Sequence, residues 1–150
     1  MIVEMFVRLK VPDNVAITAF NTLKRMKYKI KKLEKSYYYK FDVKNDIENF
    51  KKQISTVDIL VNSNKNTFNF DLNNNKNNYK KINILVQDID DGNSLLETLK
   101  ERLGFTNIKK FEKGILWTMY FDKKTNAKKT AVDITKNLLM NENYQRYKIV

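Results

Sequence analysis

The chain has 150 residues and a formal net charge of +12, because 29 lysines and arginines outnumber 17 aspartates and glutamates. It contains no histidine and no cysteine, which excludes His-based triads, imidazole proton shuttles, thiolate nucleophiles, disulfides and thiolate zinc sites. No apolar run approaches the ~18 residues of a membrane-spanning helix, and no signal peptide precedes the first strand pattern, so we expect a cytoplasmic protein with no membrane contact.

The first half of the chain alternates strand and helix patterns. Apolar residues alternate with polar ones from Met5 to Val11, Pro12 ends that strand, and Asp13 or Asn14 is the expected N-cap of the helix that follows. The expected elements are a strand at 5–11, a helix to about 26, strands at 28–33 and 37–43 in a hairpin that turns near 34–36, a helix from about 46 to 62, and a strand at 67–72.

The second half repeats this order, and part of its sequence repeats as well. Ile30–Val43 reads IKKLEKSYYYKFDV, and Ile108–Asp122 reads IKKFEKGILWTMYFD. The expected elements are a strand at 82–88, a helix through 95–103, a hairpin of strands at 107–112 and 115–121, a helix from about 126 to 140, and a strand at 144–150. A tandem duplication explains the similarity of the two halves.

The order β-α-β-β-α-β predicts the ferredoxin-like pattern and an α+β class. We therefore expect two tandem ferredoxin-like units, residues 1–72 and 81–150, joined by an asparagine-rich linker at 73–80. The two units are expected to form a pseudo-two-fold sandwich of sheets flanked by helices.

Several of these strands are apolar or aromatic on both faces. A sheet covered by helices on one side leaves its other face bare, and such an apolar face is rarely left in water. The two sheets therefore pack on one another or bind a partner. The residues expected at this sheet interface or partner-binding face are Phe6, Tyr37, Tyr39, Phe41, Leu85, Trp117 and Met119.

An RNA-binding function is the alternative. RRM domains share the ferredoxin-like topology and stack bases on aromatic side chains of their central strands. The segment 35–41 loosely matches their third-strand motif, although Ser36 and Tyr38 stand where smaller residues are expected. Such a protein would combine an aromatic sheet face with a basic patch.

Positive charge is concentrated from the end of the first helix into the second strand. The candidate anion or RNA contacts are Lys24, Arg25, Lys27, Lys29, Lys31 and Lys32. A solvated helix and strand face would show the same charges without any ligand. A genome biased towards lysine and asparagine would also produce them, since lysine far outnumbers arginine here.

The sequence offers little material for catalysis. Its three glycines form no phosphate-binding loop. Asp88, Asp90 and Asp91 could hold a hard cation, but a loop that leads into a helix N-cap explains them more simply. We expect no metal, no cofactor and no catalytic activity of the isolated chain.

Short stretches of the second copy match a known family. Asp91-Gly92-Asn93 opens the first helix of this copy, Leu103-Gly104-Phe105 precedes its second strand, and Leu138-Leu139-Met140-Asn141 ends its last helix. With these stretches, residues 82–150 resemble PurS, the small subunit of the multi-subunit phosphoribosylformylglycinamidine synthase of purine biosynthesis. The first copy is more diverged, with Pro12-Asp13-Asn14 in place of the glycine turn.

The resemblance implies a non-catalytic scaffold or accessory subunit of an ATP-dependent amidoligase. PurS-like proteins form dimers through their sheets and bridge a glutaminase subunit to a synthase subunit. A fused pair would correspond to such a dimer, and a homodimer of fused pairs to the tetrameric arrangement. The expected partners are synthase-like and glutaminase-like subunits, with nucleic acid less favoured. The strong basicity and the fusion depart from the ordinary subunit and suggest a paralogue.

Overall fold

The computed structural model describes residues 1–72, 78–89 and 94–150 and contains one six-stranded antiparallel sheet in the order β3-β1-β2-β5-β4-β6. The strands are β1 (Ile2–Leu9), β2 (Ile30–Val43), β3 (Asn66–Asn69), β4 (Lys80–Asp88), β5 (Ile108–Phe121) and β6 (Gln145–Ile149). The helices are α1 (Asn14–Arg25), α2 (Ile47–Ile54), α3 (Ser94–Glu97) continuing as the π-helical turn η1 (Thr98–Arg102), and α4 (Ala127–Ile134) continuing as the π-helical turn η2 (Thr135–Leu139). The α+β class is confirmed.

The two hairpins expected within residues 28–43 and 107–121 are wrong. β2 and β5 are each one continuous strand of 14 residues. They pair antiparallel along almost their whole length, from Ile30 opposite Phe121 to Val43 opposite Ile108. The segment 34–36 lacks the glycine or Asn-Gly pair that a tight hairpin favours, so β2 continues and finds its partner in the other half of the chain.

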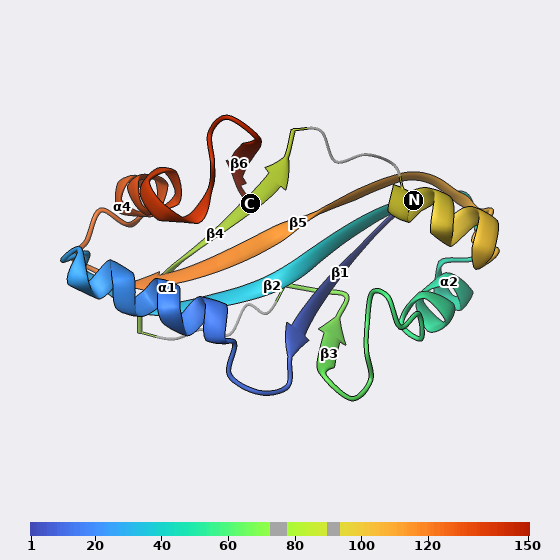
Figure 1. Cartoon of the computed structure of the whole chain (residues 1–150), viewed down its shortest axis with the longest axis horizontal. Coiled ribbons are helices and arrows are strands. Elements are labelled where there is room, and N and C mark those ends of the chain that lie inside the picture. Colours follow the sequence, from blue (N-terminus) through green and yellow to red (C-terminus); the bar gives the residue numbers. More distant parts are fainter. Residues whose placement is uncertain (73–77, 90–93) are drawn as a thin grey trace.

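The expected sandwich of two sheets is likewise replaced by a single sheet. The β2–β5 ladder joins the three strands of each half edge to edge (Figure 1). Two helix groups lie at opposite ends of these long strands, α1 with α4 and α2 with α3. Side-by-side pairing satisfies the backbone groups of two strands that would otherwise be exposed sheet edges.

The two halves of the sheet correspond by a pseudo-two-fold axis. β1 pairs with β2 and β3 in the same register in which β4 pairs with β5 and β6. The turns before β3 and β6 also match, since the Asn64 amide donates to the Asn62 side chain at 3.0 Å and the Asn143 amide donates to the Asn141 side chain at 3.0 Å. The repeat seen in the sequence thus has a counterpart in the hydrogen bonds.

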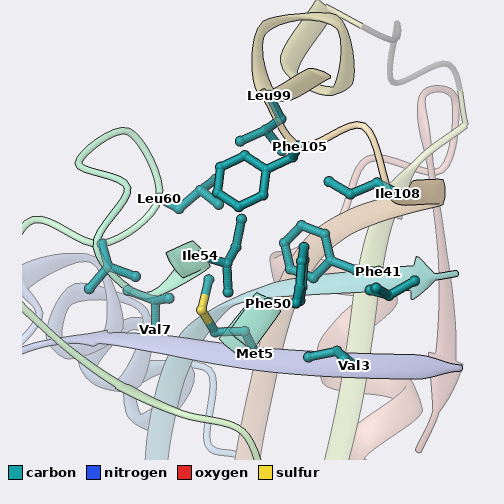
Figure 2. Close-up of a cluster of buried hydrophobic side chains, with 12 residues drawn as sticks. Val3, Met5, Val7, Phe41, Phe50, Ile54, Leu60, Leu99, Phe105 and Ile108 are labelled. Atoms are coloured by element: carbon teal, nitrogen blue, oxygen red, sulfur yellow. The ribbon is translucent and has the colours of Figure 1, made fainter. Parts of the chain in front are cut away.

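Two hydrophobic cores lie under the two helix groups, and each draws on both halves of the sequence. Leu99 and Phe105 of the second half pack with Phe41, Phe50 and the inward face of β1 (Figure 2). Conversely, Ala16 and Leu23 of α1 pack with β4, β5 and α4 in the other core. Neither core is therefore complete without residues from both halves.

Of the predicted linker at 73–80, residues 73–77 lie outside the described residues, as do Asp91, Gly92 and Asn93. Within the described residues, no helix is long and apolar enough to cross a membrane.

Candidate functional site

A row of side chains crosses the middle of the sheet on the side that carries the helices. Val7, Tyr37, Ile115 and Val86 lie directly opposite one another in neighbouring strands, so their side chains share this face. The helix groups stand at the two ends of the sheet, and Tyr37 between them is 40% exposed. We call these four residues the central row.

Two hollows flank the central row. One, of about 310 Å³, includes Tyr37, Tyr39, Lys113 and Gly114 in its lining. The other, of about 480 Å³, lies between α1, the loop after β1 and the first part of β2. We call the second the α1 groove; its lining residues are Arg8, Leu9, Val11, Pro12, Asp13, Ala16, Ile17, Phe20, Lys31, Lys32, Leu33, Glu34 and Lys35.

A largely buried ion pair lies in the α1 groove. The Lys35 ammonium is 3.4 Å from Asp13 Oδ2, and the two side chains are only 7% and 15% exposed. Asp13 also caps α1, because its Oδ1 accepts from the Val15 amide at 2.9 Å, which confirms it as the N-cap. The same ammonium lies 4.7 Å from the centre of the Tyr37 ring, so the pair connects α1 to the central row.

The rim of the α1 groove is apolar and open to solvent. Leu9, Val11 and Ile17 are 37%, 66% and 44% exposed. The lining also contains basic residues: Arg8 and Lys32 pair with Glu34, Lys35 pairs with Asp13, and Lys31 forms no ion pair within the described residues. An apolar rim with embedded cations is suited to an amphipathic segment that carries acidic residues.

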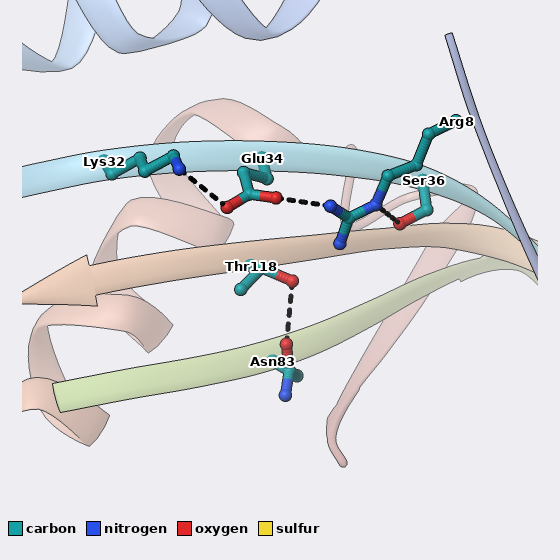
Figure 3. A network of polar contacts seen from close by, with 6 residues as sticks. All are labelled: Arg8, Lys32, Glu34, Ser36, Asn83 and Thr118. Atoms are coloured by element: carbon teal, nitrogen blue, oxygen red, sulfur yellow. Dashed lines mark hydrogen bonds and ion pairs between the residues drawn. The ribbon is translucent and has the colours of Figure 1, made fainter. Parts of the chain in front are cut away.

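The sheet face away from the helices carries a charged network instead of a bare apolar surface. The Arg8 guanidinium donates to Glu34 Oε2 at 2.5 Å and to the Ser36 hydroxyl at 3.4 Å, and Lys32 pairs with Glu34 at 3.3 Å (Figure 3). Burial alone would raise the pKa of Glu34, but the hydrogen bond from Tyr120 and the charges of Arg8 and Lys32 outweigh it and lower that pKa.

An apolar cluster occupies the centre of this same face. Phe6 and Tyr38 pack with a ring-centre distance of 5.6 Å, and Leu85 and Leu116 complete the cluster. Burial, followed by the hydrogen bond that Tyr38 donates to Glu4 at 2.6 Å, raises the pKa of the Tyr38 hydroxyl.

The aromatic rings of these strands are not exposed together on the open face. An RNA-stacking platform needs exposed rings on the open face, whereas Phe6 and Tyr38 are 6% and 5% exposed there. Tyr37, Tyr39 and Phe41 lie on the opposite, helix-carrying side, because β2 side chains alternate between the two faces.

The residues expected at a sheet interface therefore separate into three groups. Phe6 and Leu85 lie in the open-face cluster, and Tyr37 and Tyr39 line the 310 Å³ hollow. Helices, and not a second sheet, cover Phe41, Trp117 and Met119, which are buried in the two cores.

The predicted basic residues converge only in part. The side chains of Lys24, Lys27, Lys29 and Lys31 line one hollow of about 560 Å³. Arg25 donates to the Thr22 hydroxyl at 3.3 Å and does not line this hollow. Lys32 belongs to the Glu34 network on the open sheet face.

Tyr28 also lines this hollow, and Asp122, Lys124 and Thr125 from the second half complete it. Sequence reasoning missed the second-half residues because they lie about ninety positions away. The antiparallel pairing of Ile30 with Phe121 is the relationship that brings them there, and the predicted hairpins concealed it.

Among the residues that the structure describes, no group of three or more acidic side chains could hold a metal ion. A scan against protein-family models finds no match to this chain, and no curated protein has a significantly similar sequence. The resemblance to PurS therefore rests on the residues of this sequence.

Proposed function

We propose that the chain is a non-catalytic assembly subunit, PurS-like in architecture and role, that holds a synthase-like and a glutaminase-like subunit together. The observation that carries the proposal is the β2–β5 ladder, which gives one chain the geometry of an isologous dimer. A tandem duplication with fusion accounts for this geometry, because corresponding strands meet at a common axis.

The shared cores also support a fused dimer. In an ordinary dimer each protomer folds its own core, whereas here α1 lies against β2 of its own half and shares a core with residues of β4 and α4 from the second half. Fusion of two copies would keep both shared cores within one chain.

The α1 groove is the proposed contact for a partner subunit. Its exposed apolar rim at Leu9, Val11 and Ile17 supplies area that is favourable to bury. Lys31, which forms no ion pair among the described residues, favours an acidic segment. The proposed homodimer of fused chains would form separately from this groove.

Affinity purification from the native source tests the proposal. The tagged chain should recover a synthase-like or glutaminase-like protein, and the double variant Val11→Glu with Ile17→Glu should lose it. Ile59→Glu is the control, since Ile59 is also exposed, at 54%, but lies outside the groove. Recovery of only ribosomal or other RNA-bound material would refute the assembly role.

A further inference from the structure

The hollow beside the C-terminal end of α1 is unusual in its charge. We call it the lysine hollow; its lining is Lys24, Lys27, Tyr28, Lys29, Lys31, Asp122, Lys124 and Thr125. These residues come from the end of α1, the segment that leads into β2 and the loop after β5, which lie together at one end of the molecule (Figure 1).

Its five lysines face one aspartate, and within the described parts of the chain none of the five forms an ion pair. The Lys24 ammonium donates to the Ile30 carbonyl at 3.3 Å. Asp122 is engaged with its own loop, since its Oδ1 accepts from the Lys124 amide at 3.3 Å. Like charges gathered around a concavity repel one another, and a bound anion removes that repulsion.

The pseudo-two-fold axis supplies an internal comparison. At the other end of the sheet, Lys100, Gly104, Phe105, Thr106 and Lys109 occupy the positions that correspond to Lys24, Lys27, Tyr28, Lys29 and Lys31. The five residues at the lysine end carry four positive charges, whereas the corresponding five carry two. A lysine-biased genome would act on both ends alike, so composition does not explain the difference.

At the corresponding end the loops are tied together, and the hollow there, lined in part by Gly104 and Phe105, has no lysine among the described residues of its lining. The loop after β2 has only Lys44 and Asn45 before the α2 cap. The Lys44 amide donates to the Asn107 carbonyl at 2.9 Å, and the Asn107 side chain donates to the Asn45 carbonyl at 3.4 Å. The longer loop at Asp122–Thr125 leaves the lysine end open as a hollow.

The backbone at Lys27 points to a role for its side chain. Lys27 has φ +66 and the corresponding Gly104 has φ +76, both just after a helix end. The amides that follow them bond alike, Tyr28 to the Leu23 carbonyl at 3.1 Å and Phe105 to the Leu99 carbonyl at 3.0 Å. Glycine is the residue favoured in this conformation, so a lysine here strains the backbone.

We propose that the lysine hollow binds an oligophosphate group on a small molecule. Lysine is a point-charge ligand for phosphate. A volume of about 560 Å³ lies within the range of small-molecule sites. Inorganic tripolyphosphate and the phosphate chain of a nucleoside triphosphate share the required chemistry. A bounded hollow at one end of the molecule suits such a ligand better than a long RNA, which needs an extended basic groove.

Isothermal titration calorimetry of the full chain tests this with tripolyphosphate and with ATP at low salt. The triple variant Lys27→Gln, Lys29→Gln, Lys31→Gln should bind about tenfold more weakly or worse, because three charge-assisted contacts are lost. The triple variant Lys44→Gln, Lys109→Gln, Lys110→Gln removes the same charge elsewhere and should bind like the wild type. Added salt should weaken binding.

Three results would overturn the proposal. The first is that neither tripolyphosphate nor ATP binds. The second is equal weakening of binding in both triple variants, which would show a net-charge effect. The third is binding of a short single-stranded RNA alone, with a steep salt dependence. Binding of only one of the two anions would support the site and identify the source of the phosphate chain. None of these results depends on the assembly role, whose readout is partner recovery.

Discussion

Tyr37 of β2 lies directly opposite Ile115 of β5, and the two residues occupy corresponding positions in the two copies of the repeat. Two antiparallel strands related by a two-fold axis have one such self-corresponding pair, and the axis passes through it. The remaining residues of β2 pair with β5 residues whose equivalents in β2 lie on the opposite side of Tyr37. The axis explains why both cores contain residues from both halves.

Mixed cores predict that the whole chain unfolds in one transition, which the single tryptophan can report. Trp117 is 5% exposed and packs in the core that contains Leu23 of α1. Its native emission should therefore be blue-shifted relative to free tryptophan and should shift red in the same denaturant range as the loss of circular dichroism.

Leu23→Ala should lower the free energy of unfolding by about 2–5 kcal/mol, because Leu23 is fully buried. Chemical denaturation followed at Trp117 measures it. Leu99→Ala, in the other core, should shift the same Trp117 transition by a comparable amount. If Leu99→Ala leaves that transition in place, the two cores unfold independently and the idea of one cooperative unit is wrong.

The sequence predicted the class and most element positions, because alternation and helical spacing depend on which face of each element is buried. The Asp13 cap and the strand at 5–11 both follow from local chemistry. The cap is confirmed, and the strand differs from β1 only at its ends. The apolar residues of the central strands were found for the same reason.

The pairing partners could not be predicted in this way. A hairpin within residues 28–43 and the pairing of β2 with β5 bury the same side chains, because in both arrangements successive side chains point to opposite faces of the sheet. Gly114 lies between the two strands expected at 107–112 and 115–121, and in the structure it allows close packing of β5 against β4. Because the pairing partners of β2 and β5 were ambiguous, the sequence predicted a second sheet over the central strands and missed the second-half residues of the lysine hollow.

Gly114 should not tolerate a methyl group. A Cβ there would lie 2.7 Å from the Val86 carbonyl oxygen and 2.9 Å from Leu85 Cδ1. The carbonyl belongs to the neighbouring strand and cannot retreat without breaking the ladder, so Gly114→Ala should destabilise by about 1–3 kcal/mol. Denaturant midpoints measure this. Ser36→Ala, at the corresponding buried position, should cost less, and an equal loss would contradict the steric explanation.

Lys27→Gly should stabilise the protein. Relief of the left-handed strain at φ +66 outweighs the greater freedom that glycine has in the unfolded chain, for a net gain of about 0.5–1 kcal/mol. Lys29→Gly, at a residue without a positive φ, should instead cost about 0.5–1 kcal/mol. Thermal unfolding of both variants compares them. Destabilisation by Lys27→Gly would remove the argument that this lysine is kept at the expense of stability.

The Tyr120 hydroxyl should make stability depend on alkaline pH. Burial, followed by the hydrogen bond to Glu34, raises the pKa of Tyr120 to about 12, while an unfolded tyrosine ionises near about 10. Between these values the unfolded chain has lost the proton and the folded protein keeps it. The unfolded state then binds fewer protons, so this residue makes the free energy of unfolding fall as pH rises through that range.

Tyr120→Phe removes that dependence. The free energy of unfolding of the wild type minus that of this variant should therefore decrease from pH 10 to pH 12. Denaturant unfolding at each pH measures it, and the ionisation of other groups cancels in the difference. A constant difference for Tyr120→Phe would mean that the Glu34 contact does not hold the Tyr120 proton in the folded protein.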